Sequence, residues 1–306
     1  MMQKSTELIQ LEILEVRLVD LDEKQKRRSW SLKLGFIGEA EVELWIKKYG
    51  NKHWHLIHDY WFYNKKTMQA DFLIIKENRW LVIEVKNFDG KFEYKNHECT
   101  INHRLMDDDI MMSMSSKVSR LKRIASEVSA EIEVLGAMVF INEHCQVEIE
   151  QHVDFEIILR NQFKNFLKRH NDFMAMPLMP DHFNQVQKVL NRYVTKNPFQ
   201  PTGLTVENFE LLRKGVTCKD CHSFDVDVLL KNVTCRHCDS KELKSDAILR
   251  SAEQLRYVFC DNAEMVTTRN VYEFTGGQIS QGTIRKVLAN SYRKNGSTKA
   301  AYYEIE

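Results

Sequence analysis

Proline is scarce in this sequence, and its placement divides the chain. The four prolines among 306 residues all lie between positions 177 and 201. Because proline ends helices and is excluded from central strands, this span predicts a domain boundary, with the break at Thr195 to Thr205. The chain on either side of the break is long enough to form a core of its own.

The sequence also lacks long apolar runs and a large excess of positive or negative residues. No stretch approaches the roughly 18 apolar residues of a membrane span, and Glu7, Glu12 and Arg17 interrupt the N-terminal segment where a signal peptide needs an apolar core. The 44 Lys and Arg residues balance 43 Asp and Glu residues, which excludes a uniformly basic nucleic-acid coat. We therefore expect a soluble cytoplasmic protein with no membrane partner, in which any site for a polyanion arises from local clustering.

Hydrophobic periodicity predicts an α/β domain before the proline-rich span. Leucines three or four residues apart predict a helix from Ser5 or Thr6 that ends in the basic run 24–28, and a second helix follows Gly38. A third helix is predicted at 109–128 and a fourth after residue 160. Aromatic and β-branched runs predict strands at 55–63, 70–75, 80–87, 134–142 and 153–159. The order of these elements predicts a mixed sheet flanked by helices.

Two carboxylates and a lysine converge on one predicted hairpin. If its strands pair around the polar break 76–79, Asp71 lies opposite Glu84, and opposed side chains are about 5 Å apart at Cβ. Lys86 projects from the same face as Glu84, because it lies two residues further along the strand. Two such carboxylates repel by about 3 kcal/mol at an effective dielectric of about 20 unless a cation lies between them. The pattern predicts either a Mg²⁺ site or a salt bridge in which Lys86 neutralises one acid.

Three short motifs surround these residues. Segment 35–39 reads GFIGE, segment 69–71 reads QAD, and segment 83–87 reads IEVKN. In order and spacing, from Gly35 to Arg160, they resemble the NERD (nuclease-related) domain of the PD-(D/E)xK nuclease superfamily. The resemblance implies a restriction-endonuclease-like mixed sheet and metal-dependent hydrolysis of phosphodiester bonds in nucleic acid, with DNA as the expected substrate.

What the resemblance implies extends to individual positions. Asp71 and Glu84 would hold a Mg²⁺ or Mn²⁺ ion, with the carbonyl of Val85 as a third ligand. Lys86 would be the catalytic lysine. Glu39 would reach the site from its helix and position water or a second metal ion.

The helix after the hairpin departs from the family pattern. Family members often carry a proline and a downstream glutamine at its start, and the glutamine contributes to the active site. Aligned on Leu121, those positions hold Ile110 and Ser113 in this chain. A non-catalytic DNA-binding or regulatory protein with a degenerate nuclease fold is therefore the alternative. The acidic run 107–109 beside these positions is expected to cap the helix.

Four of the seven cysteines form two CxxC pairs. The pattern C-x2-C-x13-C-x2-C predicts two turns that present four thiolates to one tetrahedral ion, and the ligands would be Cys218, Cys221, Cys235 and Cys238. The segment is too small to bury a core of its own, so we expect a structural Zn²⁺ that keeps it folded. The arrangement resembles a zinc ribbon. Redox-active dithiols are the alternative.

The region after the cysteines is predicted to form a helix–turn–helix followed by a hairpin. A helix is expected at 246–259, Ser280 caps a later one, and Asn295-Gly296 is a strong hairpin-turn signal. This order resembles a winged helix, and residues 274–303 hold five basic residues and no acidic one. The side chains expected to contact nucleic acid are Gln281, Thr283, Arg285, Lys286, Arg293, Lys294 and Lys299. The alternatives are a packing domain with a solvated basic face and a tail that binds protein.

These patterns divide the chain into five parts. We expect an N-terminal helix over 1–30, a NERD-type nuclease domain over 31–195 and a linker over 196–210. A zinc ribbon over 211–243 and a winged-helix-like domain over 244–306 would follow. The tail is expected to supply the affinity for nucleic acid that the near-neutral net charge does not.

Overall fold

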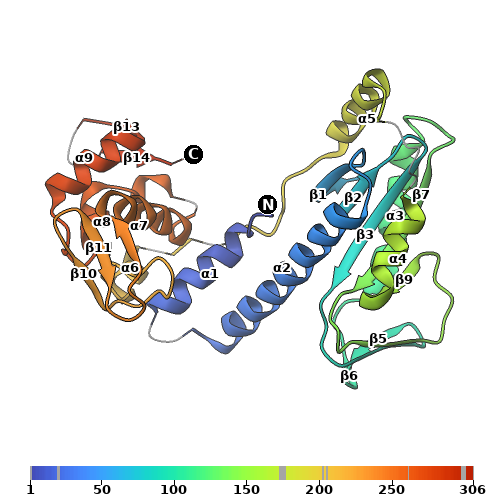
Figure 1. The fold of residues 1–306 in the computed structure, drawn as a ribbon, viewed down its shortest axis with the longest axis horizontal. Coiled ribbons are helices and arrows are strands. Elements are labelled where there is room, and N and C mark those ends of the chain that lie inside the picture. Colours follow the sequence, from blue (N-terminus) through green and yellow to red (C-terminus); the bar gives the residue numbers. More distant parts are fainter. Residues whose placement is uncertain are drawn as a thin grey trace. The chain divides into compact units, whose positions relative to one another are not determined.

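A computed structural model describes residues 2–18, 21–171, 177–201, 203–204, 206–260, 262–297 and 301–305 (Figure 1). The chain divides into two units. The first is built on Ser31–Pro198, and the second combines Gln3–Trp30 with Phe199–Glu306. Among the helices of the described residues, none is both long and apolar enough to span a membrane.

The first unit contains a five-stranded mixed sheet in the order β1-β2-β3-β7-β9 (Figure 1). Strands β1 (His55–Tyr63), β2 (Thr67–Ile75) and β3 (Arg79–Lys86) are antiparallel neighbours. Strand β7 (Glu133–Phe140) runs parallel to β3, and β9 (Glu156–Leu159) runs parallel to β7. Each corresponds to a run of aromatic and β-branched residues, and the mixed sheet confirms the predicted fold class.

Helices cover both faces of this sheet, because successive strand residues point to opposite sides. Helices α3 (Ile110–Ala125) and α5 (Pro180–Tyr193) pack on one face, and α2 (Glu23–Tyr49) and α4 (Arg160–His170) contribute to the core on the other. The core on the α3 face includes Leu73, Val82, Met114, Leu121 and Val189. The core on the α2 face includes Val42, Phe72, Ile83 and Phe163. Each fully buried side chain of this kind contributes about 1.5–3 kcal/mol, so the alternation along β2 and β3 stabilises all three layers.

The sequence does not predict a second sheet, which has the order β6-β5-β4-β8. Its strands are β4 (Lys91–Lys95), β5 (Glu98–Ile101), β6 (Arg104–Leu105) and β8 (Gln146–Ile149). They are short and carry charged residues on one face, so no apolar run marks them. The turn Asn96-His97 between β4 and β5 has φ angles of 52° and 64°, which fit the tight turn of a two-residue hairpin.

The N-terminal helices differ from the prediction. Ser5 caps α1 (Thr6–Arg17) as expected, and its hydroxyl accepts a hydrogen bond from the N–H of Leu8 at 3.2 Å. The prediction of one helix through the basic run is wrong, because α1 ends at Arg17 and the run lies in the first turns of α2. The expectation that a helix starts after Gly38 is also wrong, since Gly38 lies inside α2. Glycine is a poor helix former, and tertiary packing outweighs that preference here.

In the second unit, a short sheet follows α6 (Val206–Leu211). Its antiparallel strands are β10 (Val226–Val228), β11 (Asn232–Cys235) and β12 (Lys241–Leu243). Cys218 and Cys221 precede β10, Cys235 is the last residue of β11, and Cys238 lies between β11 and β12. Strand β10 lies in segment 223–230, where apolar and polar residues alternate between the two CxxC pairs.

Helices and a hairpin complete the second unit. Helices α7 (Lys244–Val258), α8 (Thr268–Phe274) and α9 (Gln281–Ser291) precede strands β13 (Arg293–Asn295) and β14 (Tyr302–Glu304). Strand β14 pairs with β13, and its first residue also forms a bridge with Thr267 before α8. The expected helices, the Ser280 cap and the hairpin are present. Lys299 lies outside the described residues.

Within the second unit, a buried arginine attaches α1 to the segment before the cysteines. Arg17 Nη1 donates to the carbonyl oxygens of Arg213 at 3.0 Å and Gly215 at 3.2 Å, and Nη2 donates to Gln254 Oε1 at 3.0 Å. Its guanidinium also lies 3.7 Å from the ring centroid of Phe274. Burial, and then the charge of Arg250, lower the pKa of Arg17 to about 9. These bonds tie α1 to the segment that leads into the cysteines.

Candidate functional site

The β2–β3 hairpin has the predicted register. The structure pairs Ile75 with Trp80, Leu73 with Val82, and Phe72 with Ile83. At the next position Asp71 Oδ2 accepts a hydrogen bond from the backbone N–H of Val85 at 2.8 Å. Asp71 is only 8% exposed, so its carboxyl group is buried and held by the backbone of the neighbouring strand.

Glu84 carries an ammonium group on each carboxylate oxygen. Lys86 Nζ donates to Oε1 at 2.9 Å, and Lys117 Nζ, from α3, donates to Oε2. The Lys86 side chain is 18% exposed and that of Lys117 only 6%. Glu84 and Lys86 share the face of β3 on which α3 packs, because they are two residues apart. The Lys86–Glu84 salt bridge is therefore present, together with a second lysine that the sequence analysis did not identify.

The electrostatic surroundings separate the two acids. Burial, and then the charges of Glu84 and Glu39, raise the pKa of Asp71 to about 8. Burial works in the same direction on Glu84, but Lys117 and Lys86 outweigh it and lower the pKa of Glu84 to about 2. These surroundings therefore favour the protonated form of Asp71 and the carboxylate form of Glu84.

Glu39 approaches from α2 and is bound by a histidine. Its Oε2 lies 3.3 Å from His58 Nε2, and the His58 ring lies 5.1 Å from that of Phe72, between ring centroids. Burial lowers the pKa of His58, but the bond to Glu39 outweighs it and the net direction is upward. The charge of Glu39 also contributes to the raised pKa values of Asp71 and Lys86. Glu39 thus acts on the site through its charge while its carboxylate contacts His58.

Gly38 explains how α2 reaches this end of the sheet. A Cβ atom at Gly38 would lie 2.8 Å from the Cβ of Asn87 and 3.1 Å from Cγ2 of Ile141. Asn87 Nδ2 in turn donates to the carbonyl of Leu34 at 2.9 Å. The missing side chain therefore lets the helix contact the chain just after β3. Glu39, the next residue of α2, is placed near the site by this contact.

Lys117 and His58 are the side chains that the sequence analysis missed. Lys117 lies within the buried stripe of α3, beside Met114, Val118 and Leu121. Lysine is rarely buried unless it is paired, so a lysine inside an apolar stripe is a detectable signal of a buried carboxylate partner. His58 offers no such signal, because one histidine in an aromatic strand fits a structural role equally well.

The start of α3 matches its prediction. Asp109 caps the helix, and its Oδ1 accepts a hydrogen bond from the N–H of Met112 at 2.9 Å. Ser113, which stands where the family often has glutamine, is exposed. Lys117 lies four residues further along, which is one turn away on the same side of α3.

The donors of this site suit a hard divalent cation. Mg²⁺ prefers oxygen ligands and is commonly held by one or two carboxylates together with waters, so Asp71, Glu84 and the Val85 carbonyl are sufficient in kind. Their ligand atoms are not gathered into a closed cage. Among the described residues, the only group of three or more metal-binding side chains with ligand atoms within 4.8 Å of one another is formed by cysteines.

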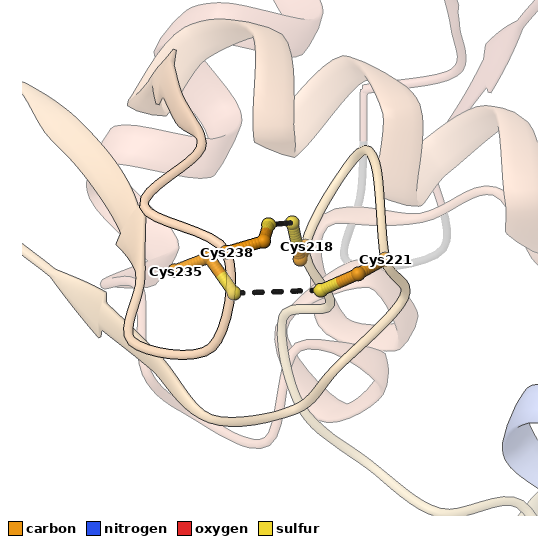
Figure 2. A group of neighbouring side chains, drawn as sticks. All are labelled: Cys218, Cys221, Cys235 and Cys238. Atoms are coloured by element: carbon orange, nitrogen blue, oxygen red, sulfur yellow. Dashed lines mark hydrogen bonds between the residues drawn. The ribbon is translucent and has the colours of Figure 1, made fainter.

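The cysteine group matches the zinc prediction, and Figure 2 shows its four sulfur atoms turned toward one another. The Sγ atoms of Cys218 and Cys238 are 3.6 Å apart, and those of Cys221 and Cys235 are 3.5 Å apart. Four sulfurs about 2.3 Å from a tetrahedral Zn²⁺ are separated by about 3.8 Å, whereas a disulfide needs about 2.05 Å. The cluster therefore fits a metal such as zinc and the geometry of a zinc ribbon.

Backbone groups of both turns also support thiolates. The N–H of Asp220 donates to Cys218 Sγ at 3.4 Å, and that of His237 donates to Cys235 Sγ at 3.3 Å. Burial raises the pKa of Cys218, but backbone hydrogen bonds outweigh it and lower that pKa to about 6. Such bonds to the sulfur orient the ligands around an ion.

The residues predicted to bind nucleic acid lie on α9 and β13. The exposed members are Gln281, Thr283, Arg285, Lys286, Arg293 and Lys294. Helix α9 buries Ile284 and Leu288 on its opposite side. Within the described ranges, none of the four basic residues of this set forms an ion pair, unlike Arg236, Arg250 and Arg269 of the same unit. Four exposed basic side chains without an ion pair in the described part of the chain thus lie on α9 and β13.

Comparison with known proteins gives one match. Residues 34–141 match the model of a family described as Nuclease-related domain (NERD). The matched segment runs from α2 to the end of β7 and contains Glu39, Asp71, Glu84, Lys86 and Lys117. It confirms the resemblance predicted from the motifs and supports a nuclease-related function. No curated protein and no solved structure matches the chain.

Proposed function

We propose, on the premise of the NERD match over residues 34–141, that this chain is a metal-dependent nuclease that hydrolyses phosphodiester bonds of DNA. The observation that carries the proposal is the meeting of Asp71, Glu84 and Lys86 at the end of one hairpin. A salt bridge between Lys86 and Glu84 alone gives no reason to bury Asp71 beside them. A divalent cation shared by Asp71 and Glu84 would explain why Asp71 is buried there.

In this proposal Asp71 and Glu84 hold Mg²⁺ or Mn²⁺, with the carbonyl of Val85 as a third ligand. The chemistry that such an ion supplies when bound is polarisation of a phosphate oxygen and activation of water. Lys86 donates to the negative charge that develops on the scissile phosphate, where a buried ammonium group is more effective than in water. Glu39 accepts a hydrogen bond from the attacking water and so orients it.

We also propose that the second unit binds nucleic acid. Helices α7, α8 and α9 with the hairpin β13–β14 have the element order of a winged helix, and an isolated bridge joins Thr267 before α8 to Tyr302 of the hairpin. In this proposal α9 presents Gln281, Thr283, Arg285 and Lys286 to a DNA groove, and Arg293, Lys294 and Lys299 contact phosphates. A structural Zn²⁺ keeps β10, β11 and β12 folded.

The corresponding domain limits remain those predicted from the sequence. They are an N-terminal segment over 1–30, which holds α1 and the first residues of α2, a nuclease domain over 31–195, a linker over 196–210, a zinc ribbon over 211–243 and a winged-helix-like domain over 244–306. The DNA-binding surface would give the enzyme affinity for a substrate that its net charge of +1 does not attract.

One observation favours a second candidate function. Ser113 cannot supply the amide group that the family often places at this position. A non-catalytic DNA-binding or regulatory protein on a nuclease fold is therefore the alternative, with the same zinc site and the same basic surface.

A cleavage assay separates the two candidates. Wild-type protein with Mg²⁺ or Mn²⁺ is expected to cut supercoiled plasmid or single-stranded DNA, and Lys86→Ala is expected to reduce the rate at least about 100-fold. Lys122→Ala, an exposed lysine of α3, serves as the matched control and is expected to cut normally. Wild-type protein that binds DNA but cuts neither substrate would support the non-catalytic alternative.

A further inference from the structure

Lys117 has no assigned role in the proposed chemistry, yet it is among the most buried lysines of the chain. Its side chain is 6% exposed, and its ammonium group contacts Glu84 Oε2. Because Lys86 takes the other oxygen at 2.9 Å, no oxygen of Glu84 lacks a cationic partner. A divalent ion that binds Glu84 must therefore compete with a lysine.

The charges around Lys117 explain why a second lysine is needed. Burial and the negative charges of Glu84 and Glu39 act together on Asp71, whose carboxyl group is fixed by the N–H of Val85. Lys86 alone would leave the Glu84 carboxylate with one ammonium group, beside the buried carboxyl group of Asp71. Lys117 brings the number of cations in contact with Glu84 to two. The acids can therefore remain close together when no metal ion neutralises them.

The position of Lys117 also relates it to the missing glutamine. Ser113 occupies the family position at the start of α3, and Lys117 follows one helical turn later on the same side. Helix α3 thus still presents a polar group toward β3, but the group is a charged donor that binds Glu84 directly.

We infer that Lys117 is a resident counter-cation of this site. It is a positioning residue that holds Glu84 beside Asp71 in the metal-free protein and gives up Oε2 when a divalent ion binds. The inference rests on the proposed function only in treating Glu84 as a metal ligand. Its consequence is a site that keeps its geometry without metal and binds metal with reduced affinity.

The test is the affinity of the full-length, zinc-loaded chain for Mn²⁺, measured by calorimetric titration. Lys117→Met keeps a long unbranched side chain and removes the charge, and it is expected to bind Mn²⁺ about tenfold more tightly, since one charge-assisted hydrogen bond no longer has to be broken. Lys122→Met removes a charge from an exposed position of the same helix and is expected to change the affinity less than twofold. Equal or weaker binding by Lys117→Met would overturn the inference.

A stability measurement covers the case in which Lys117→Met folds poorly. Four of the five tryptophans lie in Ser31–Pro198, so their fluorescence follows the unfolding of the first unit. Lys117→Met is expected to have a lower Tm than wild type in metal-free buffer and a larger rise in Tm on addition of Mn²⁺. If Lys117 only fills space, the rise in Tm will be the same in both proteins, and the inference fails.

The outcomes for the inference and for the nuclease proposal are distinguishable. A chain that binds Mn²⁺ more tightly after Lys117→Met but cuts no DNA supports the counter-cation and contradicts the nuclease. A chain that cuts DNA but shows no gain in Mn²⁺ affinity contradicts the counter-cation alone. Glu84→Gln is expected to abolish the Mn²⁺ binding, and unchanged binding would contradict both.

Discussion

The backbone N–H of Val85 donates to Asp71 Oδ2 at 2.8 Å, so a buried acid of β2 is fixed by the main chain of β3. This bond holds the Asp71 carboxyl group next to Glu84 without any contribution from a flexible side chain. Asparagine at position 71 can accept the same hydrogen bond through Oδ1 but cannot carry the charge. The charge and the orientation of this group are therefore separable by a single substitution.

Asp71→Asn is expected to change how the stability of the first unit depends on pH. The pKa of Asp71 is raised to about 8 in the folded chain, and an aspartate in an unfolded chain titrates near about 4. The folded state holds the proton more tightly, so the contribution of Asp71 to stability is fully present below about pH 4 and is lost as the pH rises through about 8. Relative to Asp71→Asn, wild type should lose at most about 1.4 kcal/mol per pH unit in this window.

Urea unfolding followed by tryptophan fluorescence in metal-free buffer, from pH 5 to 8.5, measures this difference. Asp108→Asn, at an exposed position of the same unit, is the control and should leave the wild-type slope unchanged. The account of Asp71 fails if wild type and Asp71→Asn lose stability in parallel.

Gly38→Ala is expected to destabilise the first unit by about 1–3 kcal/mol, because the new methyl group would overlap Asn87 and press on Ile141. Gly35→Ala is the matched control, since a Cβ at Gly35 has nothing within 4 Å. In a helix interior that change should stabilise by about 0.5–1 kcal/mol. Equilibrium unfolding in urea measures both values. Similar effects of the two substitutions would show that α2 does not need the close approach at Gly38.

Removal of zinc is expected to destabilise the segment that holds β10, β11 and β12. Its strands are three or four residues long, and the ion would link the two CxxC turns, which are otherwise held by the packing of residues such as Val226 and Val233 in the core of the second unit. Metal analysis should find one zinc per chain, and Cys221→Ser should lose it. Cys145→Ser, in the first unit, should keep full zinc content. A wild-type chain without zinc, or a Cys221→Ser chain with it, would contradict the assignment of this site.

Replacement of Arg293 and Lys294, the described residues proposed to contact phosphates, by glutamine is expected to weaken DNA binding about tenfold or more at low salt. Each lost phosphate contact should reduce the slope of log affinity against log salt by about 0.9, so the double variant should lose up to about 2 in slope. Fluorescence anisotropy across a salt series measures both quantities. Arg236→Gln is the control, because Arg236 is already paired with Asp227. An unchanged slope in the double variant would place DNA binding elsewhere or remove it.

The hairpin could be predicted in detail because several constraints agree there. The apolar runs on either side of residues 76–79 leave one register that keeps both strands buried, and the structure has that register. The cysteine cluster was predictable for a similar reason, since one ion constrains all four residues. The resemblance to the NERD family then added Glu39, which no local pattern assigns to the hairpin.

Other features depend on contacts that the sequence does not display. The break between α1 and α2 falls inside the leucine pattern, because Leu18 and Leu21 lie between the two helices. The strands of the second sheet are too short to give a period. Gly38 was predicted outside a helix because its packing partner Asn87 is 49 positions away in the sequence. Lys117 was not singled out because the apolar residues of α3, such as Met111 and Met114, already explain why this helix packs on the sheet.

A crystal structure of the full-length chain soaked in Mn²⁺ tests the central claim most directly. Anomalous scattering should locate one ion in contact with the carboxylates of both Asp71 and Glu84, with the Lys117 ammonium group moved off Glu84 Oε2. Either of two results would contradict it. One is an ion bound by neither acid, and the other is no ion at Asp71 and Glu84 with the Lys117–Glu84 contact intact at saturating Mn²⁺.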